Sequence, residues 1–311
     1  MVRVHLDTDI GGDIDDLCAL ALLLRSPEVE ITGITTVIDH GGKRAGYARF
    51  ALSLAGRSDV SVAAGADVNL GRYALGTDLP PEERFWPSPV RPLPGPLDAA
   101  LDLLERSLAA GAILISIGPL TNLALLEERR PGILRRAQLY SMAGHVRKAP
   151  QGFPQWDHMM DYNVQADPAA ALLVLQSSET TLVPIEATAQ TALRRSDVAV
   201  LRRSDPLCQL LAHQAEAFAP NGEFINYQHD PLACAVALGW PGVAIESLPL
   251  SITREDGFVR MREAAGGLQQ LRVVTGVDRD AFSRYWLDTV TSRAPCTAES
   301  SQPSAAASVA R

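Results

Sequence analysis

Five aspartates crowd into a ten-residue segment close to the start of the chain. The segment, DTDIGGDIDD, carries them at positions 7, 9, 13, 15 and 16, directly after a short apolar stretch. Such crowding at the end of a buried strand costs free energy unless protons or a cation neutralise it. Because the segment offers carboxylate and carbonyl oxygens but no thiolate or paired histidines, it predicts a hard, oxygen-seeking cation, Ca²⁺ or Mg²⁺, rather than zinc.

Simpler explanations account for these aspartates less well. An acidic helix cap would explain Asp15 and Asp16, which precede an expected helix, but it leaves the other aspartates unexplained. A calcium loop of the EF-hand type needs an acidic or amide residue at its fifth position and Glu at its twelfth, but those positions hold Gly11 and Cys18. The phosphatase motif DxDx[TV] fits the first two aspartates, but Gly11 stands where it requires Thr or Val. A bound cation is therefore the favoured prediction.

Alternating strands and helices are expected to position the aspartates. An apolar strand at 2–6 leads into the acidic turn, and an apolar helical run follows at 17–24. The alternation continues, with strands expected at 29–37, 60–64, 112–117, 138–142 and 181–185 and helices at 43–55, 97–109, 121–127 and 168–176. It predicts an α/β fold in which a mostly parallel, Rossmann-like sheet is flanked by helices. Ligands bind such sheets at the carboxyl ends of the strands, which is where the aspartates lie.

The remaining segments are less regular. Residues 68–96 are rich in Pro and Gly and predict a long surface loop, with a lid or an interface arm as alternatives. A helical, amphipathic pattern runs over 195–218, short strands are expected within 243–274, and a last helix is expected at 280–290. One domain is therefore predicted over residues 1–293, followed by a disordered tail at 294–311.

Composition excludes several classes of protein. The 311 residues are 47% hydrophobic and 21% charged, without a linker, as expected for one soluble globular domain. A net charge of −8 and the lack of a basic cluster argue against a nucleic-acid polymer as partner. No apolar run approaches the roughly 18 residues of a membrane span. Four cysteines without CxxC spacing, and a start unlike a signal peptide, favour the cytoplasm.

Four motifs together resemble one protein family. LDTDIGGDIDDLCALALLL begins at Leu6, GPLTNLALL at Gly118, DYNVQADPAAA at Asp161 and HDPLACAVAL at His229. They resemble the signatures of the nucleoside hydrolases of the inosine-uridine preferring type, the first in its longer variant with two extra residues before the final Asp pair. The resemblance spans residues 2 to about 291 and is more specific than any single motif. It implies calcium-dependent hydrolysis of the N-glycosidic bond of ribonucleosides, which releases ribose and a free base.

The resemblance implies a set of metal ligands. Asp9, Asp16 and Asp230 would hold a calcium ion through their carboxylates, and Ile117 would contribute its backbone carbonyl. Asp9 would also orient or deprotonate the attacking water. Taken alone, Asp230 before Pro231 would be an ordinary helix start. Its partnership with the first aspartate cluster makes it a ligand candidate.

The resemblance also implies which residues contact the substrate. Asp15 would bind a ribose hydroxyl, and Asn163 and Asp161 would hold the far side of the ribose near its 5′ hydroxyl. Asp161 is one methylene shorter than the family's usual Glu at this place. His229 would protonate the departing base, since an imidazole titrates near neutral pH. His40, which follows the expected strand ending in TTVI, is predicted to face the substrate.

Three aromatic residues lie in segments that flank the expected pocket: Trp156, Phe224 and Tyr227. Each could stack on a base. Sequence position does not single one out, so the preferred base stays open at this point.

Two alternative functions remain. An enzyme of the same fold could act on another ribosylated metabolite, such as nicotinamide riboside or an unusual nucleoside. The departures at His40 and Asp161, and the loop at 68–96 where the family usually carries a His-Gly-rich segment, keep this alternative open. A catalytically silent nucleoside- and calcium-binding protein is the other, and the intact aspartates argue against it. The resemblance further implies a homodimer or homotetramer that acts on small molecules in nucleoside salvage.

Overall fold

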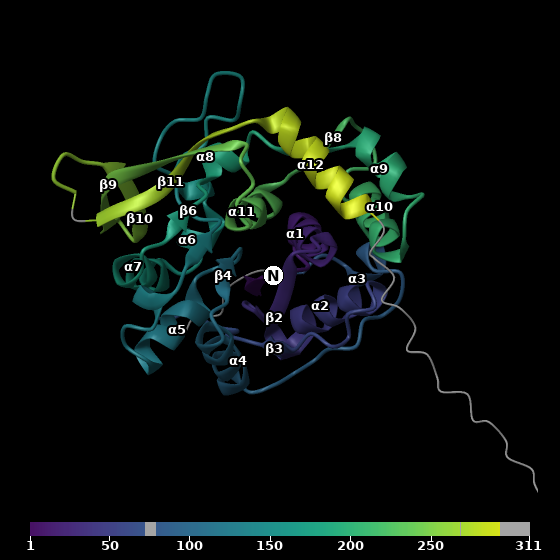
Figure 1. The fold of residues 1–311 in the computed structure, drawn as a ribbon, viewed down its shortest axis with the longest axis horizontal. Coiled ribbons are helices and arrows are strands. Elements are labelled where there is room, and N and C mark those ends of the chain that lie inside the picture. The colour runs from purple at the N-terminus through teal and green to yellow at the C-terminus, as the bar shows by residue number, and fades with distance from the viewer. Residues whose placement is uncertain (72–78, 268, 293–311) are drawn as a thin grey trace, which may run out of the picture.

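A mixed sheet forms the centre of the molecule in the computed structural model, which describes residues 1–71, 79–267 and 269–292 (Figure 1). Among these residues nine strands join in the order β10-β9-β11-β6-β5-β4-β1-β2-β3. Their bounds are β1 (Val2–Thr8), β2 (Val29–Thr36), β3 (Val62–Ala64), β4 (Ile113–Ser116), β5 (Leu139–Ser141), β6 (Thr181–Leu182), β9 (Val243–Glu255), β10 (Phe258–Glu263) and β11 (Gln269–Val277). A separate antiparallel pair consists of β7 (Ala192–Arg194) and β8 (Phe224–Tyr227).

Helices connect the strands and cover the sheet. The longer ones are α1 (Asp15–Arg25), α2 (Lys43–Leu54), α4 (Leu97–Ala109), α5 (Thr121–Arg129), α7 (Pro168–Ser177), α10 (Pro206–Phe218), α11 (His229–Ala237) and α12 (Arg279–Thr291). The shorter ones are α3 (Glu82–Phe85), α6 (Tyr162–Gln165), α8 (Ile185–Thr188), α9 (Arg195–Leu201), η1 (His40–Gly42), η2 (Leu134–Arg136) and η3 (His158–Met160). Among the described residues, none of these helices has the length and apolarity to span a membrane.

The parallel part of the sheet confirms the predicted fold class. β1 pairs in parallel with both β2 and β4, and the parallel pairing continues through β5 and β6 to β11. Strands and helices alternate along the chain as expected, because each parallel connection must cross over one face of the sheet. The strand ends after β1, β4 and β5 consequently meet at one edge.

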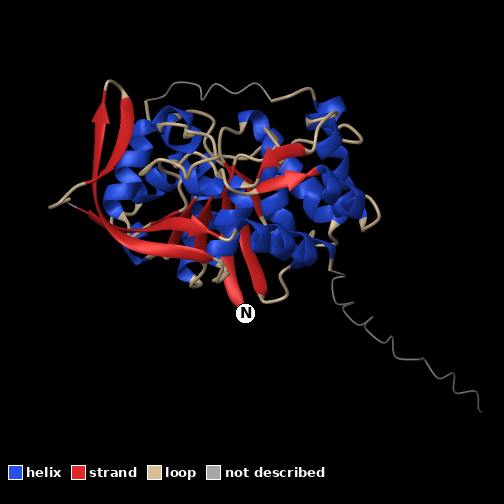
Figure 2. Cartoon of the chain, turned by 90° about the horizontal axis from the view of Figure 1, so that it is seen from above, coloured by secondary structure: helices blue, strands red, loops and turns tan. Residues whose placement is uncertain are grey.

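The C-terminal strands differ from the prediction of short strands. β9 is long and pairs antiparallel with β10 and β11, so that these strands extend from one end of the molecule (Figure 2). The chain reverses between β9 and β10 at Asp256 and Gly257, which both have positive φ angles, 51° and 90°. A two-residue turn of this kind closes antiparallel hairpins, and Asp-Gly is its usual sequence. That dipeptide was the available signal for the hairpin.

The helical pattern over 195–218 corresponds to two helices. α9 ends at Leu201 and α10 begins at Pro206. Asp205 caps α10, because its side chain accepts hydrogen bonds from Leu207 N at 2.9 Å and Cys208 N at 3.2 Å. An Asp at the N-cap followed by Pro at the first helical position favours a new helix start over a continuous helix.

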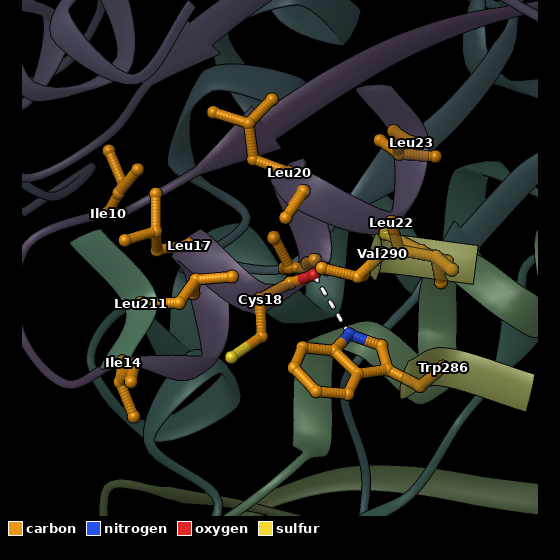
Figure 3. Packing of buried hydrophobic residues seen from close by; sticks show 14 of the residues in the cluster. Ile10, Ile14, Leu17, Cys18, Leu20, Leu22, Leu23, Leu211, Trp286 and Val290 are labelled. Carbon is orange, nitrogen blue, oxygen red and sulfur yellow. Dashed lines mark hydrogen bonds between the residues drawn. The ribbon is translucent and has the colours of Figure 1, made fainter. Parts of the chain in front are cut away.

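Helix α1 lies in the middle of the hydrophobic core. Its residues Leu17 to Leu23 are buried, and α10, α11 and α12 pack around it. Figure 3 shows the ring of Trp286 from α12 against this helix, with its Nε1 donating to the carbonyl oxygen of Cys18 at 3.1 Å. A helix that is apolar on all sides is stable only when buried. This packing holds the N-terminus of α1, which carries two of the aspartates, in a defined place.

Two predicted segments lie wholly or partly outside the described residues: the tail at 294–311, and positions 72–78 of the loop at 68–96. The described end of that loop packs against the body of the protein. Trp86 is buried, and its ring stacks on Tyr47 with 4.2 Å between centroids. The domain boundary at residue 293 stays a prediction.

Candidate active site

A cavity lies at the carboxyl ends of the central strands. Its volume is about 440 Å³, within the roughly 300–1,000 Å³ typical of sites for small organic ligands. Seven of the residues that the sequence assigned to a site line it: Asp9, Asp15, Asp16, Ile117, Asn163, His229 and Asp230. The fold therefore brings together motifs from widely separated parts of the chain.

The loop between β1 and α1 is held by polar and apolar contacts. The hydroxyl of Thr8 donates a hydrogen bond to Asp16 Oδ1 and accepts one from Ile10 N at 3.2 Å. Ile10 and Ile14 are buried, so the apolar residues of the loop anchor it while its aspartates line the cavity. Because α1 begins at Asp15, the free N–H groups of its first turn favour negative charge there.

Burial and mutual repulsion disfavour the ionised carboxylates. Burial first, and then neighbouring aspartates, raise the pKa of Asp15, Asp16 and Asp230 well above the usual range of aspartate. The pKa of Asp9 is raised to about 6, chiefly by burial, with a further rise from Asp13 and an opposing effect of a nearby guanidinium. A bound cation would relieve this repulsion by replacing the protons that the carboxylates otherwise retain.

Three of the carboxylates are close enough to share a cation. One oxygen from each of Asp13, Asp15 and Asp16 lies within 4.8 Å of the other two. Asp9 and Asp230, two of the predicted ligands, line the same cavity. Carboxylate oxygens suit a hard divalent ion such as Ca²⁺ or Mg²⁺, so the donor set fits a cation of this class. Asp13 was not among the predicted ligands, although it belongs to the same sequence cluster.

Asn163 joins two strand ends beside the aspartates. Its Nδ2 donates to the carbonyl oxygen of Ile117, after β4, at 3.1 Å and to that of Met142, after β5, at 3.0 Å. The carbonyl of Ile117, a predicted metal ligand, thus already accepts one hydrogen bond. A carbonyl oxygen has two lone pairs, so this bond leaves a position for a second partner.

Two predicted substrate contacts lie away from the lining of this cavity. Asp161 is 1% exposed and caps α6, where its carboxylate accepts hydrogen bonds from Gly144 N at 2.6 Å and Val164 N at 3.3 Å. Burial raises its pKa to about 7. His40 is exposed at the start of η1, and its neighbours Gly41 and Gly42 line a different cavity. Their positive φ angles, 68° and 75°, turn the chain at this point.

Two aromatic rings lie beside the imidazole of His229. The centroid of Tyr227 lies 5.4 Å from that of the imidazole, and the centroid of Trp156 lies 6.1 Å from it. Phe224 packs on Tyr227, with 4.7 Å between the two ring centroids. Of the three aromatic residues considered from the sequence, Trp156 lines the cavity itself. Burial lowers the pKa of His229 to about 4, and the charge of Asp13 opposes this fall.

One buried cation at the site was missed from the sequence. Arg44 is 2% exposed and lines the cavity. Its guanidinium donates to the carbonyl oxygens of Ile38 at 2.9 Å, of Ile10 at 3.1 Å and of Asp9. Its charge lowers the pKa of Asp9 and of Asp16. A lone arginine early in a helix looks like a solvated surface residue in the sequence, and only its tertiary contacts distinguish it.

The sequence matches the family model of the inosine-uridine preferring nucleoside hydrolases over residues 4–284. The chain belongs to the nucleoside hydrolase family. This confirms the family predicted from the four motifs, and with it a hydrolase that acts on N-glycosidic bonds.

Relatives and solved structures agree with this assignment. The pyrimidine-specific ribonucleoside hydrolase RihA of Shewanella sp. (strain MR-7) is 27% identical over 92% of this chain and 95% of its own. The plant nucleoside hydrolase PpNRh1 superimposes with a TM-score of 0.79 at 21% identity, covering 94% of this chain and 99% of that one. A purine-preferring ribonucleoside hydrolase from Gardnerella vaginalis has a TM-score of 0.74 at 22% identity, covering 92% and 98%. The nucleoside hydrolase fold is therefore shared over nearly the whole chain.

Proposed function

We propose that this nucleoside hydrolase cleaves ribonucleosides to ribose and free base with the help of a calcium ion. The observation that carries the proposal is the convergence of the aspartate cluster, Asn163, His229 and Asp230 in one cavity of nucleoside size. Cleavage of a ribosyl C–N bond needs a positioned water, anchored ribose hydroxyls and help for the leaving group. The residues in the cavity can supply each of these.

The aspartates act at the ribose end of the proposed reaction. Asp9 accepts a proton from the attacking water, and Asp15 accepts a hydrogen bond from a ribose hydroxyl. Asn163 keeps the two strand ends in register through its bonds to Ile117 and Met142. Positive charge develops on the ribose ring in the transition state, and nearby carboxylates stabilise it more than they stabilise the neutral substrate.

The proposed calcium ion would be held by Asp9, Asp16, Asp230 and the carbonyl of Ile117, and the position of Asp13 adds it to the candidates. When bound, calcium would supply positive charge that favours ionisation of a water and fixes the ribose diol. Because Asp15 is proposed to bind one hydroxyl of that diol, 2′-deoxyribonucleosides should be poor substrates.

His229 is proposed to act at the other end, by giving a proton to the departing base. Trp156, which lines the cavity beside this imidazole, could stack on the base. The relatives include a pyrimidine-specific and a purine-preferring enzyme, so they do not select a base for this chain.

For Asp161 we propose an indirect role. Its carboxylate binds Gly144 N and Val164 N, next to Asn163, and so supports the turn that presents this residue. The substrate role of His40 stays a prediction, and another ribosylated metabolite, such as nicotinamide riboside, remains the alternative substrate.

The test is release of reducing sugar from purine, pyrimidine and nicotinamide ribonucleosides, each with calcium, with magnesium and with excess chelator. Release that requires calcium and is lost with chelator would support the proposal and identify the base. Full activity in exhaustively metal-free enzyme would overturn the calcium requirement. No release from any riboside, together with calcium binding measured by calorimetry, would favour the silent binding protein.

We also propose a cytoplasmic homodimer or homotetramer. The free, buried thiols of Cys18, Cys208 and Cys234 suit a reducing compartment. Light scattering of the purified protein would measure the number of subunits, and a monomer at all concentrations would overturn the proposed assembly.

A further inference from the structure

The imidazole of His229 forms a hydrogen bond with a buried hydroxyl group. Thr188, the last residue of α8, is 0% exposed, and its Oγ1 lies 2.6 Å from His229 Nδ1. The same Oγ1 lies 3.2 Å from the carbonyl oxygen of Ile185, one turn earlier in the helix. The opposite ring nitrogen, Nε2, makes no hydrogen bond within the described part of the chain, and His229 lines the cavity.

One assignment of hydrogens satisfies both contacts of the Thr188 hydroxyl. A threonine hydroxyl has one hydrogen to donate and lone pairs to accept with. If Thr188 gives its hydrogen to the carbonyl of Ile185, which can only accept, it must accept a hydrogen from Nδ1 of His229. Both short contacts are then satisfied at once. Nδ1 keeps its proton in this arrangement, so Nε2 is the nitrogen that exchanges a proton on the cavity side.

The segment that carries Thr188 is also fixed to the backbone next to the histidine. The hydroxyl of Thr191 lies within hydrogen-bond distance of the carbonyl oxygens of Thr188, at 2.8 Å, and Gln228, at 3.1 Å, and Gln228 N donates to Thr191 O at 3.3 Å. Gln228 directly precedes His229. The rings of Tyr227 and Trp156 flank the imidazole on other sides. The bonds of Thr191 therefore join the segment to the main chain before His229, whereas the hydrogen-bond contact with the imidazole itself comes from Thr188.

We propose that Thr188 is a positioning residue that keeps the Nδ1 proton of His229 in place and so presents Nε2 to the departing base. This inference rests on the proposed function. In the step concerned, Nε2 first takes a proton from solvent. The electron pair of the C1′–N bond then passes to the base nitrogen, which takes that proton from Nε2. The neutral ring retains its proton on Nδ1, bound to Thr188. Water adds to C1′ and gives a proton to Asp9, and exchange with solvent restores both groups.

The test compares two leaving groups in Thr188→Val, which keeps the shape of the side chain but removes its hydroxyl. p-Nitrophenyl β-D-ribofuranoside releases a stable anion that needs no proton, whereas a natural nucleoside releases a base that does. Thr188→Val should lower kcat for the nucleoside about 10- to 100-fold. This is part of the ~10²–10⁴-fold rate enhancement that a general acid contributes. It should change kcat for the nitrophenyl riboside by less than about threefold. Thr188→Ser, which restores the hydroxyl, should recover most of the lost activity.

Thr191→Val is the matched control. Thr191 is also a buried threonine of this segment, but among the described residues its hydroxyl contacts backbone carbonyls and no side chain. Its replacement should affect both substrates to the same extent. Equal losses on both substrates in Thr188→Val would show a merely structural role and overturn this inference alone. A wild-type enzyme that cleaves no riboside would overturn the proposed function as well.

If Thr188→Val does not fold, the wild-type enzyme still decides the question. Nitrogen-15 NMR of the histidine ring, with the His229→Gln variant to identify its signals, reports which nitrogen carries the proton when the ring is neutral. A proton on Nδ1 supports the proposal, and a proton on Nε2 overturns it.

Discussion

Replacement of Arg44 by methionine tests whether this buried cation holds the aspartate loop. Methionine keeps the length of the apolar stem but removes the charge and the donors to the carbonyl oxygens of Ile38, Ile10 and Asp9. A hydrogen bond to a charged group contributes about 1.5–3 kcal/mol, and breaking a buried charge interaction costs about 3–5 kcal/mol. These contributions overlap, so we expect the variant to lose about 3–5 kcal/mol of unfolding free energy.

The assay is urea and thermal unfolding of the metal-free protein. For a protein of this size the loss corresponds to a fall in Tm of roughly 5–15 °C. Arg49→Met is the matched control, because Arg49 lies on the same helix, α2, with an exposed side chain, and should change stability by less than about 0.5 kcal/mol. A fall no larger than that of the control would refute this reasoning.

Three further predictions concern the same cavity and the segments that hold it. Asp9→Asn should lower kcat by at least about 10³-fold while leaving Tm within a few degrees, and near-normal turnover in a folded variant would contradict its role as base. Gly11→Ala should lower both stability and activity. Gly11 has a φ of +110°, and an added Cβ would lie 2.5 Å from the ring of Tyr47. A variant as stable as wild type in thermal unfolding would count against this prediction. The unfolding free energy of metal-free enzyme should fall by on the order of 1–2 kcal/mol between pH 6.5 and 8. Burial raises the pKa of Asp7 and Asp161 to about 7, so the folded state still holds protons there that the unfolded state has lost, and this stabilisation disappears as the pH rises through about 7. Unfolding free energy that rises over this range would contradict the assignment.

The order of strands and helices was predictable from the sequence. Apolar runs of strand length alternate with helical runs, and parallel strands require such crossovers, so fold class follows from local pattern. The chemistry of the aspartate segment was also predictable, because five carboxylates after a buried strand need a cation or protons to neutralise them whatever surrounds them. The helical pattern at 195–218 did not say how many helices it contains, although the Asp205–Pro206 pair that begins α10 was readable as a helix start.

Tertiary structure decided which side chains reach the cavity. Asp161 was expected at the ribose, yet its short carboxylate is bound by Gly144 N and Val164 N, and His40 lies on an exposed turn. Arg44 and Thr188 carry no motif that marks them, but each contacts a residue of the site from a different element. Sequence patterns predict which residues follow a strand, because the end of a strand depends on neighbours along the chain. The direction of a side chain and its hydrogen-bond partners depend on elements that meet only after packing, so they are settled by the folded structure alone.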